Sequence, residues 1–390
     1  MRIAITHPTT VARVARGTER LIHETAVYMG QHGHDVRIIA CKPGPRQIEK
    51  IDGYTCDSHR RLWHPSLGRL GVREEHAFVL TSMRELVRKP YDVVHAHSMG
   101  DAFGATLARR ITGTPFVFFI NGLPPNVHYY RTISTGGSVF RKVVNSADEI
   151  ICVSEYVSRY NEERFGRRGA RIPVPVDLEQ FPLWEGPKQD PPVIFCAAAL
   201  NDHRKGGRVL MRAFNIVKQH RKDAVLHNAS AILPQVRDEL LALVDSRWRD
   251  DVHFLGNVAW QDLPQLYGRA TVSVLPSLWE AFGLVTVESM ACGTPVVATR
   301  DGALPEIISN TRVGRLFDPG DTSSFEPDNA EGLAEALVQG LELGEDPATR
   351  QHCRAHVRQY SWETNGPLIE QLYHRVSDRR HSLPAGGDGA

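Results

Sequence analysis

The sequence of 390 residues has few of the features that mark secreted, zinc-binding or membrane-spanning proteins. Its six cysteines are scattered without Cys-x-x-Cys spacing, and those at 152, 196 and 292 lie in apolar runs, which indicates buried thiols rather than disulfides or a zinc site. No stretch approaches the roughly 18 apolar residues of a membrane-spanning helix. The first residues form a strand pattern without the charged and apolar segments of a signal peptide. We therefore expect a cytoplasmic protein.

Motifs for several ligand classes are also missing. The opening strand and helix carry no Gly-x-Gly-x-x-Gly, so a dinucleotide-binding interpretation lacks its chemistry. There is no Asp-x-Asp, and His, Cys and carboxylate residues do not cluster at metal-ligand spacing, so we expect no bound metal and no other cofactor. Lys and Arg number 46 against 45 Asp and Glu, and the net charge of +1 gives no sign of a nucleic-acid partner.

The length suits two domains of about 150 to 200 residues each. Strand and helix patterns alternate along both halves, which is typical of α/β domains, and we predict two Rossmann-like domains with parallel sheets. The predicted boundaries are a first domain over 1–182, a proline-rich linker over 183–192, a second domain over 193–362, a last helix over 363–378 and a flexible tail over 379–390.

The most informative stretch covers residues 276–308. An apolar run over 271–275 predicts a buried strand, and the loop after it carries Glu280 and Phe282. The apolar-periodic segment 284–291 predicts a helix, and a second short strand follows at once. This order of strand, loop, helix and strand is the unit of α/β domains that bind ligands at the carboxyl ends of their strands.

The start of this helix has the chemistry of an anion site. Gly283 lets a ligand approach the backbone, and the N–H groups of the first turn, near Leu284 and Val285, can bind a phosphate. Glu280 and Glu288 flank this site, so a ligand with hydroxyls at both ends and phosphate between them, a nucleotide-sugar, would fit. Taken alone, two such glutamates are more often a solvated loop residue and a helix-dipole acid.

The whole string decides between these interpretations. From Glu280 to Ala298 it reads E-A-F-G-L-V-T-V-E-S-M-A-C-G-T-P-V-V-A, which resembles the glutamate-x7-glutamate signature of glycosyltransferase family 4. The resemblance covers nearly the full length. It implies the GT-B fold, in which two Rossmann-like domains face each other across a cleft, and a last helix that crosses back to the first domain. It also implies that Glu280 holds sugar hydroxyls and Glu288 the ribose diol.

In the first domain the resemblance extends to three strand ends. Gly17 belongs to a loop that reads R-G-T-E-R where the family usually has G-G-x-E-R. His97 follows the strand pattern D-V-V-H-A-H-S and has two interpretations, a satisfied structural histidine or a residue that contacts sugar or acceptor. Asn121 replaces the family's usual His, so that contact with the transferred sugar is altered.

In the second domain the loop N-D-H-R-K-G-G, residues 201–207, predicts a phosphate cradle, in which glycine allows approach and Arg204 and Lys205 supply charge. Alone, it would be interpreted as a solvated basic turn. The family pattern has an additional Arg where this chain has Leu200, and Arg204 is our candidate to replace it. Gly256 lies in a turn that, in the family, holds the nucleotide base by backbone groups.

The implied activity is retaining, metal-independent transfer of a hexose-type sugar from a nucleotide-diphosphate donor to a hydroxyl of a small molecule, glycolipid or glycan, with a UDP-sugar favoured over a GDP-sugar. Alternatives are a nucleotide-sugar epimerase, a sugar phosphorylase, which would need a lysine suited to a pyridoxal Schiff base, and a noncatalytic nucleotide-sugar-binding protein. Residues 60–90 combine Arg, His and aromatics, so peripheral membrane contact is a weaker alternative to a solvated, helix-rich face.

Overall fold

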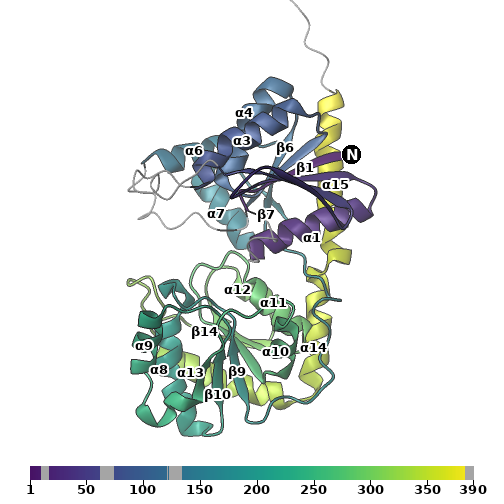
Figure 1. The fold of residues 1–390 in the computed structure, drawn as a ribbon. Helices are drawn as coiled ribbons and strands as arrows, with labels where there is room; N and C mark the ends of the chain where they lie inside the picture. The colour runs from purple at the N-terminus through teal and green to yellow at the C-terminus, as the bar shows by residue number, and fades with distance from the viewer. Residues whose placement is uncertain (10–16, 62–73, 121, 123–133, 383–390) are drawn as a thin grey trace, which may run out of the picture. The chain divides into compact units, whose positions relative to one another are not determined.

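The computed structural model describes residues 1–9, 17–61, 74–120, 122 and 134–382, and the chain divides into two compact units (Figure 1). Unit 1 comprises residues 1–174 and 365–390, and unit 2 comprises residues 175–364. The proline-rich segment 183–192 therefore lies within unit 2. The Arg350 guanidinium donates to the carbonyls of Trp184 and Gly186 at 3.2 and 2.8 Å, which ties this segment to helix α14 (Ala348–Val357) of the same unit.

Unit 1 is built on an eight-stranded sheet with the order β3-β4-β2-β1-β5-β6-β7-β8. Its strands are β1 (Arg2–Thr6), β2 (Asp35–Lys42), β3 (Gln47–Ile51), β4 (Tyr54–Arg60), β5 (Val93–Ala96), β6 (Phe116–Ile120), β7 (Glu149–Cys152) and β8 (Ala170–Arg171). Its helices are α1 (Gly17–Gln31), α3 (Glu74–Arg88), α4 (Met99–Thr112), α6 (Ser134–Ser146), α7 (Glu155–Phe165) and most of α15 (Trp362–Ser382).

Unit 2 is built on a six-stranded sheet with the order β11-β10-β9-β12-β13-β14, parallel throughout. Its strands are β9 (Val193–Cys196), β10 (Val225–Asn228), β11 (Val252–Phe254), β12 (Val272–Leu275), β13 (Val296–Thr299) and β14 (Gly314–Phe317). Its helices, besides α14, are η1 (His203–Lys205), α8 (Gly207–His220), α9 (Pro234–Ala242), η2 (Ser246–Asp251), α10 (Leu263–Arg269), α11 (Leu284–Ala291), α12 (Leu304–Ile307), α13 (Ala330–Glu345) and η3 (Arg358–Tyr360).

The central strands of both sheets are buried along their whole length. Every residue of β6, β9, β12 and β13 is buried, and most of these residues are Val, Ile, Phe or Ala. Helices cover both faces of each sheet in Figure 1, which buries these central strands on both sides. Buried parallel strands therefore appear in the sequence as continuous apolar runs instead of alternating patterns.

Residues 60–90, predicted as a solvated, helix-rich face, contain helix α3, in which Arg84 and Arg88 are exposed, and a hairpin precedes them. β3 and β4 pair antiparallel, and the turn between them places Asp52 and Gly53 at φ 37° and 88°. In α3, Phe78 is only 2% exposed, so its ring packs in the core and is not available to a membrane. Trp63, Arg69 and Arg73 lie outside the described residues.

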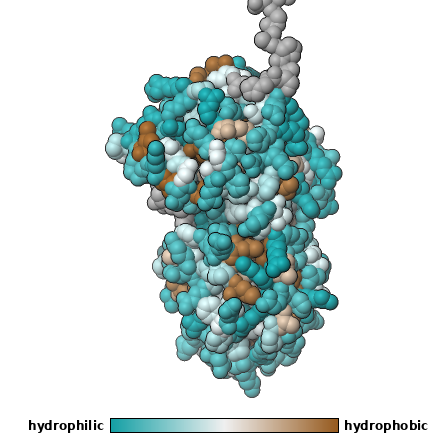
Figure 2. Space-filling model, turned by 90° about the vertical axis from the view of Figure 1, so that its right-hand side faces the viewer, coloured by the Kyte–Doolittle hydropathy of each residue, from teal (hydrophilic) through white to brown (hydrophobic). Residues whose placement is uncertain are grey.

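The surface offers apolar groups only in scattered places. The most exposed large hydrophobic side chains of the described chain are Leu80, Ile111, Leu233 and Ile48, which belong to four different segments. On the face shown in Figure 2, polar side chains predominate and hydrophobic ones form small separate groups. None of the helices in the described ranges has both the length and the apolar character needed to cross a bilayer.

The last helix is longer than predicted. We expected residues 363–378, and α15 continues to Ser382. Ile369, Leu372, Tyr373 and Val376 are all buried in unit 1, so the apolar face continues close to the end of the helix.

Candidate active site

The strand order of unit 2 identifies the edge of the sheet where a ligand would bind. β9 pairs with β10 on one side and with β12 on the other. The chain runs from β9 to β10 and from β12 to β13, so the connections that leave β9 and β12 run in opposite directions along the sheet. Such a reversal is a topological switch point, and open α/β sheets bind ligands outside the carboxyl ends of the strands there. The loops that follow β9 and β12, residues 197–206 and 276–283, are called here the two switch-point loops.

The two switch-point loops are joined by backbone contacts. The Leu278 amide donates to the Arg204 carbonyl at 2.8 Å. Gly206 adopts φ 70°, and a Cβ atom there would lie only 2.1 Å from the Pro276 carbonyl oxygen. Any other residue at 206 would push the loops apart, so glycine is required for this close approach.

An ion pair completes the junction. The Lys205 ammonium, from the first loop, donates to the Glu280 carboxylate, from the second. Lys205 is 28% exposed and Glu280 15% exposed, so both charges face a partly enclosed space rather than open solvent. The two residues that the sequence predicted from separate motifs are therefore brought into direct contact across the switch point.

Glu280 is held firmly by its own backbone. Its carbonyl accepts from the Ala303 amide at 2.9 Å, and a Cβ atom on Gly302 would lie 2.5 Å from that carbonyl oxygen. The preceding residue, Trp279, has φ 55°, a left-handed conformation that a bulky residue rarely adopts, and its amide donates to the Asp301 carboxylate. Strain of this kind persists where the surroundings over-determine the backbone, and it is often found at binding sites.

Helix α11 begins at Leu284, as predicted, four residues after Glu280. Gly283 precedes its first turn with φ 87°, and the amides of Leu284 and Val285 open the helix, where N–H groups have no intrahelical acceptor. Phe282 has a different environment from the one expected of a ligand contact: it is 4% exposed, and its ring packs edge-on against Tyr360 at 5.7 Å between centroids. Phe282 therefore anchors the loop in the core.

Glu288 lies deeper than Glu280. It is 1% exposed, and the buried Tyr267 hydroxyl donates to its Oε2 atom at 3.0 Å. No pattern in the sequence pointed to Tyr267, because a lone tyrosine in the short helix α10 carries no motif. The structure thus assigns a hydrogen-bond donor to Glu288 from a neighbouring helix of the same unit.

The remaining predicted residues of unit 2 lie around this junction or beside it. Arg204 makes two side-chain hydrogen bonds to Asp202, at 2.6 and 3.2 Å, and its charge is therefore compensated locally. Leu200 is 3% exposed and packs beside Gly207. Gly256 follows β11 at φ 74°.

Unit 1 has a corresponding switch point between β1 and β5, and His97 lies directly after β5. It is 3% exposed, and within the described part of the chain neither of its ring nitrogens has a hydrogen-bond partner. Its ring lies 4.1 Å from the His95 ring and 5.2 Å from the Phe119 ring, measured between centroids. Buried polar groups without partners are rare, and a ligand is one of the explanations for them.

His95 and His97 are both held uncharged. Burial lowers the pKa of His95 to about 3, and the Tyr373 hydroxyl hydrogen-bonds its Nδ1 atom. Burial, together with the nearby His95 and His7, keeps the pKa of His97 well below its usual range. A neutral imidazole can accept or donate one hydrogen bond at each nitrogen, which suits contact with a hydroxyl.

Asp101 holds the His97 backbone in place and was missed at the level of sequence. Its carboxylate accepts from the amides of His97 and Ser98 at 2.8 Å each, and from the Thr6 hydroxyl at 2.9 Å. It thereby connects the ends of β5 and β1 across the switch point. The signal was available, because Ser98 and Asp101 form the Ser-x-x-acid spacing of a capping box at the start of α4.

For two predicted residues of unit 1, Gly17 and Asn121, the structure gives no contact that bears on a role in the site. Gly17 is the first residue of α1, next to the loop we predicted it to shape. Asn121 lies outside the described residues.

Comparison with known proteins shows which family this chain belongs to. The model described as Glycosyltransferase Family 4 matches residues 15–180, and the model described as Glycosyl transferases group 1 matches residues 191–342. The chain belongs to glycosyltransferase family 4. The first matched region contains β5 and His97, and the second contains both switch-point loops of unit 2.

Relatives of the family 4 chain cover nearly its full length. The phosphatidyl-myo-inositol mannosyltransferase of Propionibacterium freudenreichii is 24% identical over 389 residues, which cover 96% of this chain and 94% of the relative. The D-inositol 3-phosphate glycosyltransferase of Pseudarthrobacter chlorophenolicus is 28% identical over 412 residues, covering 95% and 93%. This chain is a glycosyltransferase of the GT-B type.

Solved structures confirm the predicted fold class. Sucrose-phosphate synthase from Thermosynechococcus elongatus superposes with a TM-score of 0.77 at 21% identity, covering 97% of this chain and 99% of the other. Anabaena HepE in complex with UDP and glucose superposes with a TM-score of 0.69 at 18% identity, covering 96% and 100%. The two parallel-sheet units of the family 4 chain are thus the two domains of a GT-B protein.

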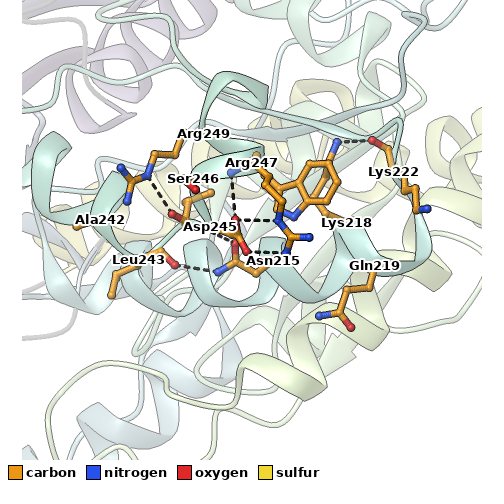
Figure 3. A pocket seen from close by; sticks show the side chains of 12 residues that line it. Asn215, Lys218, Gln219, Lys222, Ala242, Leu243, Asp245, Ser246, Arg247 and Arg249 are labelled. Atoms are coloured by element: carbon orange, nitrogen blue, oxygen red, sulfur yellow. Dashed lines mark hydrogen bonds and ion pairs between the residues drawn. The ribbon is translucent and has the colours of Figure 1, made fainter.

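Unit 2 also has a cavity that is not part of the candidate site. A cavity of about 820 Å³ lies between the carboxyl end of α8 and η2, lined by charged side chains including Lys218 and Arg247 (Figure 3). Arg247 pairs with Asp245 at 2.7 Å, and Lys218 pairs with Asp251 at 2.8 Å. The cavity lies where β10 and β11 begin, and ligands of parallel sheets bind at the opposite, carboxyl ends.

Residues 228–230 read N-A-S, which matches the pattern of a glycosylation site, but Asn228 belongs to the core of unit 2. Asn228 is fully buried, and its side-chain amide donates to the carbonyls of Cys196 and Ala198 at 3.0 Å each. It therefore fixes the start of the first switch-point loop.

The low pKa of His95 predicts an acid sensitivity. Between pH 6.5 and about 3 the unfolded chain binds a proton at this position that the folded chain does not, so stability is lost as the pH falls through this window. His95→Asn keeps an acceptor for Tyr373 without a titrating group. In urea unfolding at pH 7, 6 and 5, we expect its unfolding free energy to fall less steeply than that of the wild type, with a difference in slope that approaches about 1.4 kcal/mol per pH unit near pH 5. His203→Asn, at an exposed side chain of unit 2, is the control, and equal slopes for wild type and His95→Asn would contradict the prediction.

Proposed function

We propose that this glycosyltransferase moves a hexose-type sugar from a nucleotide-diphosphate donor to a hydroxyl of a small-molecule, glycolipid or glycan acceptor, with retention of anomeric configuration. The observation that carries the proposal is the Lys205–Glu280 pair, which spans the switch point of unit 2 beside the start of α11. A cation for phosphate, a carboxylate for hydroxyls and a helix N-terminus for negative charge are the groups that such a donor requires.

Charge on the leaving diphosphate is the main electrostatic demand of the reaction. A lysine ammonium has three donors, so Lys205 can keep one on Glu280 and direct others at phosphate oxygens. The amides of Leu284 and Val285 add donors fixed by the helix. Preorganised groups of this kind stabilise a developing anion without a metal ion. We therefore propose metal-independent transfer, with Arg204 as an auxiliary cation that would first have to leave Asp202.

The two glutamates have separate roles in this proposal. Glu280 accepts hydrogen bonds from hydroxyls of the transferred sugar, because it is partly exposed and next to the cation. Glu288, buried and oriented by Tyr267, accepts from the ribose diol. Neither needs to act as a nucleophile: in same-face attack, a donor phosphate oxygen accepts the proton of the acceptor hydroxyl.

The donor and acceptor classes rest on the residues of both units and on the relatives. We propose a UDP-sugar rather than a GDP-sugar, supported by the UDP and glucose bound to Anabaena HepE. The two relatives above are named for inositol-containing acceptors, which supports a polyhydroxylated acceptor. In unit 1 we assign His97, neutral and without a protein partner among the described residues, to a hydroxyl of the sugar or acceptor.

The deciding experiment measures release of UDP from UDP-hexose with and without inositol-type acceptors, in excess chelator, and determines the anomeric configuration of the product by NMR. We expect acceptor-dependent release in chelator and the same configuration in donor and product, because Lys205 and α11 neutralise the diphosphate. Isomerised donor without transfer would indicate a nucleotide-sugar epimerase, and tight binding without turnover would indicate a noncatalytic binding protein. Activity lost in chelator and restored by magnesium or manganese would contradict the metal-independent mechanism.

The ammonium of Lys205 is expected to contribute more than the guanidinium of Arg204. Lys205→Ala should lower kcat/KM by about 100- to 1000-fold, the effect of removing one preorganised donor from a developing anion. Arg204→Ala should lower it less, because Asp202 already compensates that charge. Arg208→Ala, which removes a cation in the first turn of α8 that pairs with Glu239 of α9, is the matched control. A near-normal Lys205→Ala together with an impaired Arg204→Ala would transfer the phosphate role to Arg204.

Substitutions of Glu280 and Glu288 should have different effects on kcat and on UDP affinity. Glu288→Gln should weaken the affinity for free UDP by about tenfold, because a charged acceptor for the ribose is lost in ground and transition states alike. Glu280→Gln should mainly lower kcat and leave UDP affinity unchanged. Affinity is measured by calorimetry and kcat by the release assay, with the exposed Glu342→Gln as control. Equal losses of UDP affinity in both variants would contradict the assignment.

A further inference from the structure

Three side chains with metal-binding atoms converge in unit 1, away from the residues assigned to the reaction. His34 lies in the turn between α1 and β2, whereas Glu370 and His374 are four residues apart on α15. Residues at this spacing share one face of a helix. The ligand atoms of the three side chains all lie within 4.8 Å of one another.

The distances are close to those of a metal centre. His34 Nε2 lies 2.9 Å from Glu370 Oε1, and the His34 and His374 rings are 5.8 Å apart between centroids, tilted by 59°. A tetrahedral zinc ion with bonds of about 2.0–2.2 Å has neighbouring donor atoms about 3.3 Å apart. We propose that His34, Glu370 and His374 form a zinc site, with water in the fourth position.

The surroundings support ligation through His34 Nε2. The His34 side chain is 6% exposed, and its Nδ1 atom lies 3.2 Å from the Met1 amine. Nε2, which faces Glu370, is therefore the ring atom positioned to bind zinc, and Nδ1 has an outer contact of the kind that orients metal-bound histidines. A His34–Glu370 ion pair alone would explain two of the three positions and would leave the placement of His374 unexplained.

A second group of such residues in the described chain shows why the first is favoured. Asp57, His59 and Glu85 also lie within this range of one another. Arg46 pairs with both carboxylates, at 2.6 and 3.2 Å, and Arg37 pairs with Asp57 at 2.9 Å. A metal ion there would leave guanidinium groups without their partners, whereas Glu370 has no Arg or Lys partner in the described residues.

Zinc at the first cluster would be structural. It would connect residues 336 positions apart in the sequence and so hold the carboxyl-terminal helix on unit 1. Closing so long a loop stabilises the folded state against the unfolded one. The proposed charge chemistry of transfer uses Lys205 in unit 2 instead. Removing zinc should therefore lower stability without abolishing transfer, so this inference and the proposed function can fail separately.

The experiment uses the full chain, stripped of metal with a chelator and then dialysed. Zn²⁺ is titrated by calorimetry, Co²⁺ binding is followed by its visible spectrum, and the thermal midpoint is recorded against zinc concentration. We expect one zinc ion per chain, the bands of four-coordinate Co²⁺, and a midpoint that rises with zinc. His374→Ala, at an exposed position, should keep the fold and weaken zinc binding by more than about tenfold.

The controls separate a zinc site from adventitious binding. His32→Ala removes an exposed histidine close to His34 that contacts Tyr28 instead, and it should leave zinc affinity unchanged. Glu370→Gln keeps a hydrogen-bond acceptor for His34 while removing the carboxylate ligand, and it should weaken zinc binding as His374→Ala does. Failure of the wild-type chain to bind zinc one to one, or equal zinc affinity in wild type and His374→Ala, would overturn the proposal.

Discussion

The candidate active site of unit 2 depends on one constraint, the close approach of the loops that follow β9 and β12. Parallel pairing of these strands brings their carboxyl ends together, and the departure of the chain in opposite directions opens the space between the loops. Gly206 then permits backbone contact with Pro276, and Lys205 and Glu280 meet as a result. A larger residue at 206 would separate the ion pair without changing either charge.

The same physical constraint acts in unit 1 with different chemistry. There the ends of β1 and β5 are joined by a buried carboxylate, Asp101, which accepts from Thr6 and from the backbone of His97. Burial raises the pKa of Asp101, although the hydrogen bonds it accepts oppose that shift. The consequence is a rigid backbone beneath a neutral imidazole, so His97 offers position and hydrogen bonding rather than charge.

An element of this fold could be predicted from the sequence where its burial leaves a pattern among neighbouring residues. The strands β12 and β13 and the helix α11 were predicted because burial on both faces produces apolar runs and periodic patterns. The hairpin of β3 and β4 was not, since β3 is exposed over most of its length and shows no apolar alternation. Its Asp52-Gly53 turn was a usable signal for a hairpin.

The residues of the candidate site were predictable from the sequence, but the contacts around them were not. Glu280, Lys205 and Gly283 lie in local motifs, whereas the contacts that define their environments come from elsewhere in the chain. Tyr267 reaches Glu288 from another helix, and the Asp301 carboxylate accepts from the amide of Trp279, the residue before Glu280. Phe282 lies in the same motif as Glu280, and its ring packs against Tyr360 in the core. Partners distant in sequence cannot be derived from spacing, because they depend on how helices pack.

The pairing of Lys205 with Glu280 also bears on which ligands the site can accept. Separating two partly buried charges is costly unless each finds a new partner. An inorganic phosphate could take the lysine but would leave the carboxylate facing an anion, and a free sugar could satisfy the carboxylate but offers the lysine no charge. On the proposed assignment, a nucleotide-diphosphate sugar would supply phosphate to Lys205 and hydroxyls to Glu280 at the same time. The ion pair thus favours a ligand that carries both groups, because any ligand that carries only one leaves a charge without its partner.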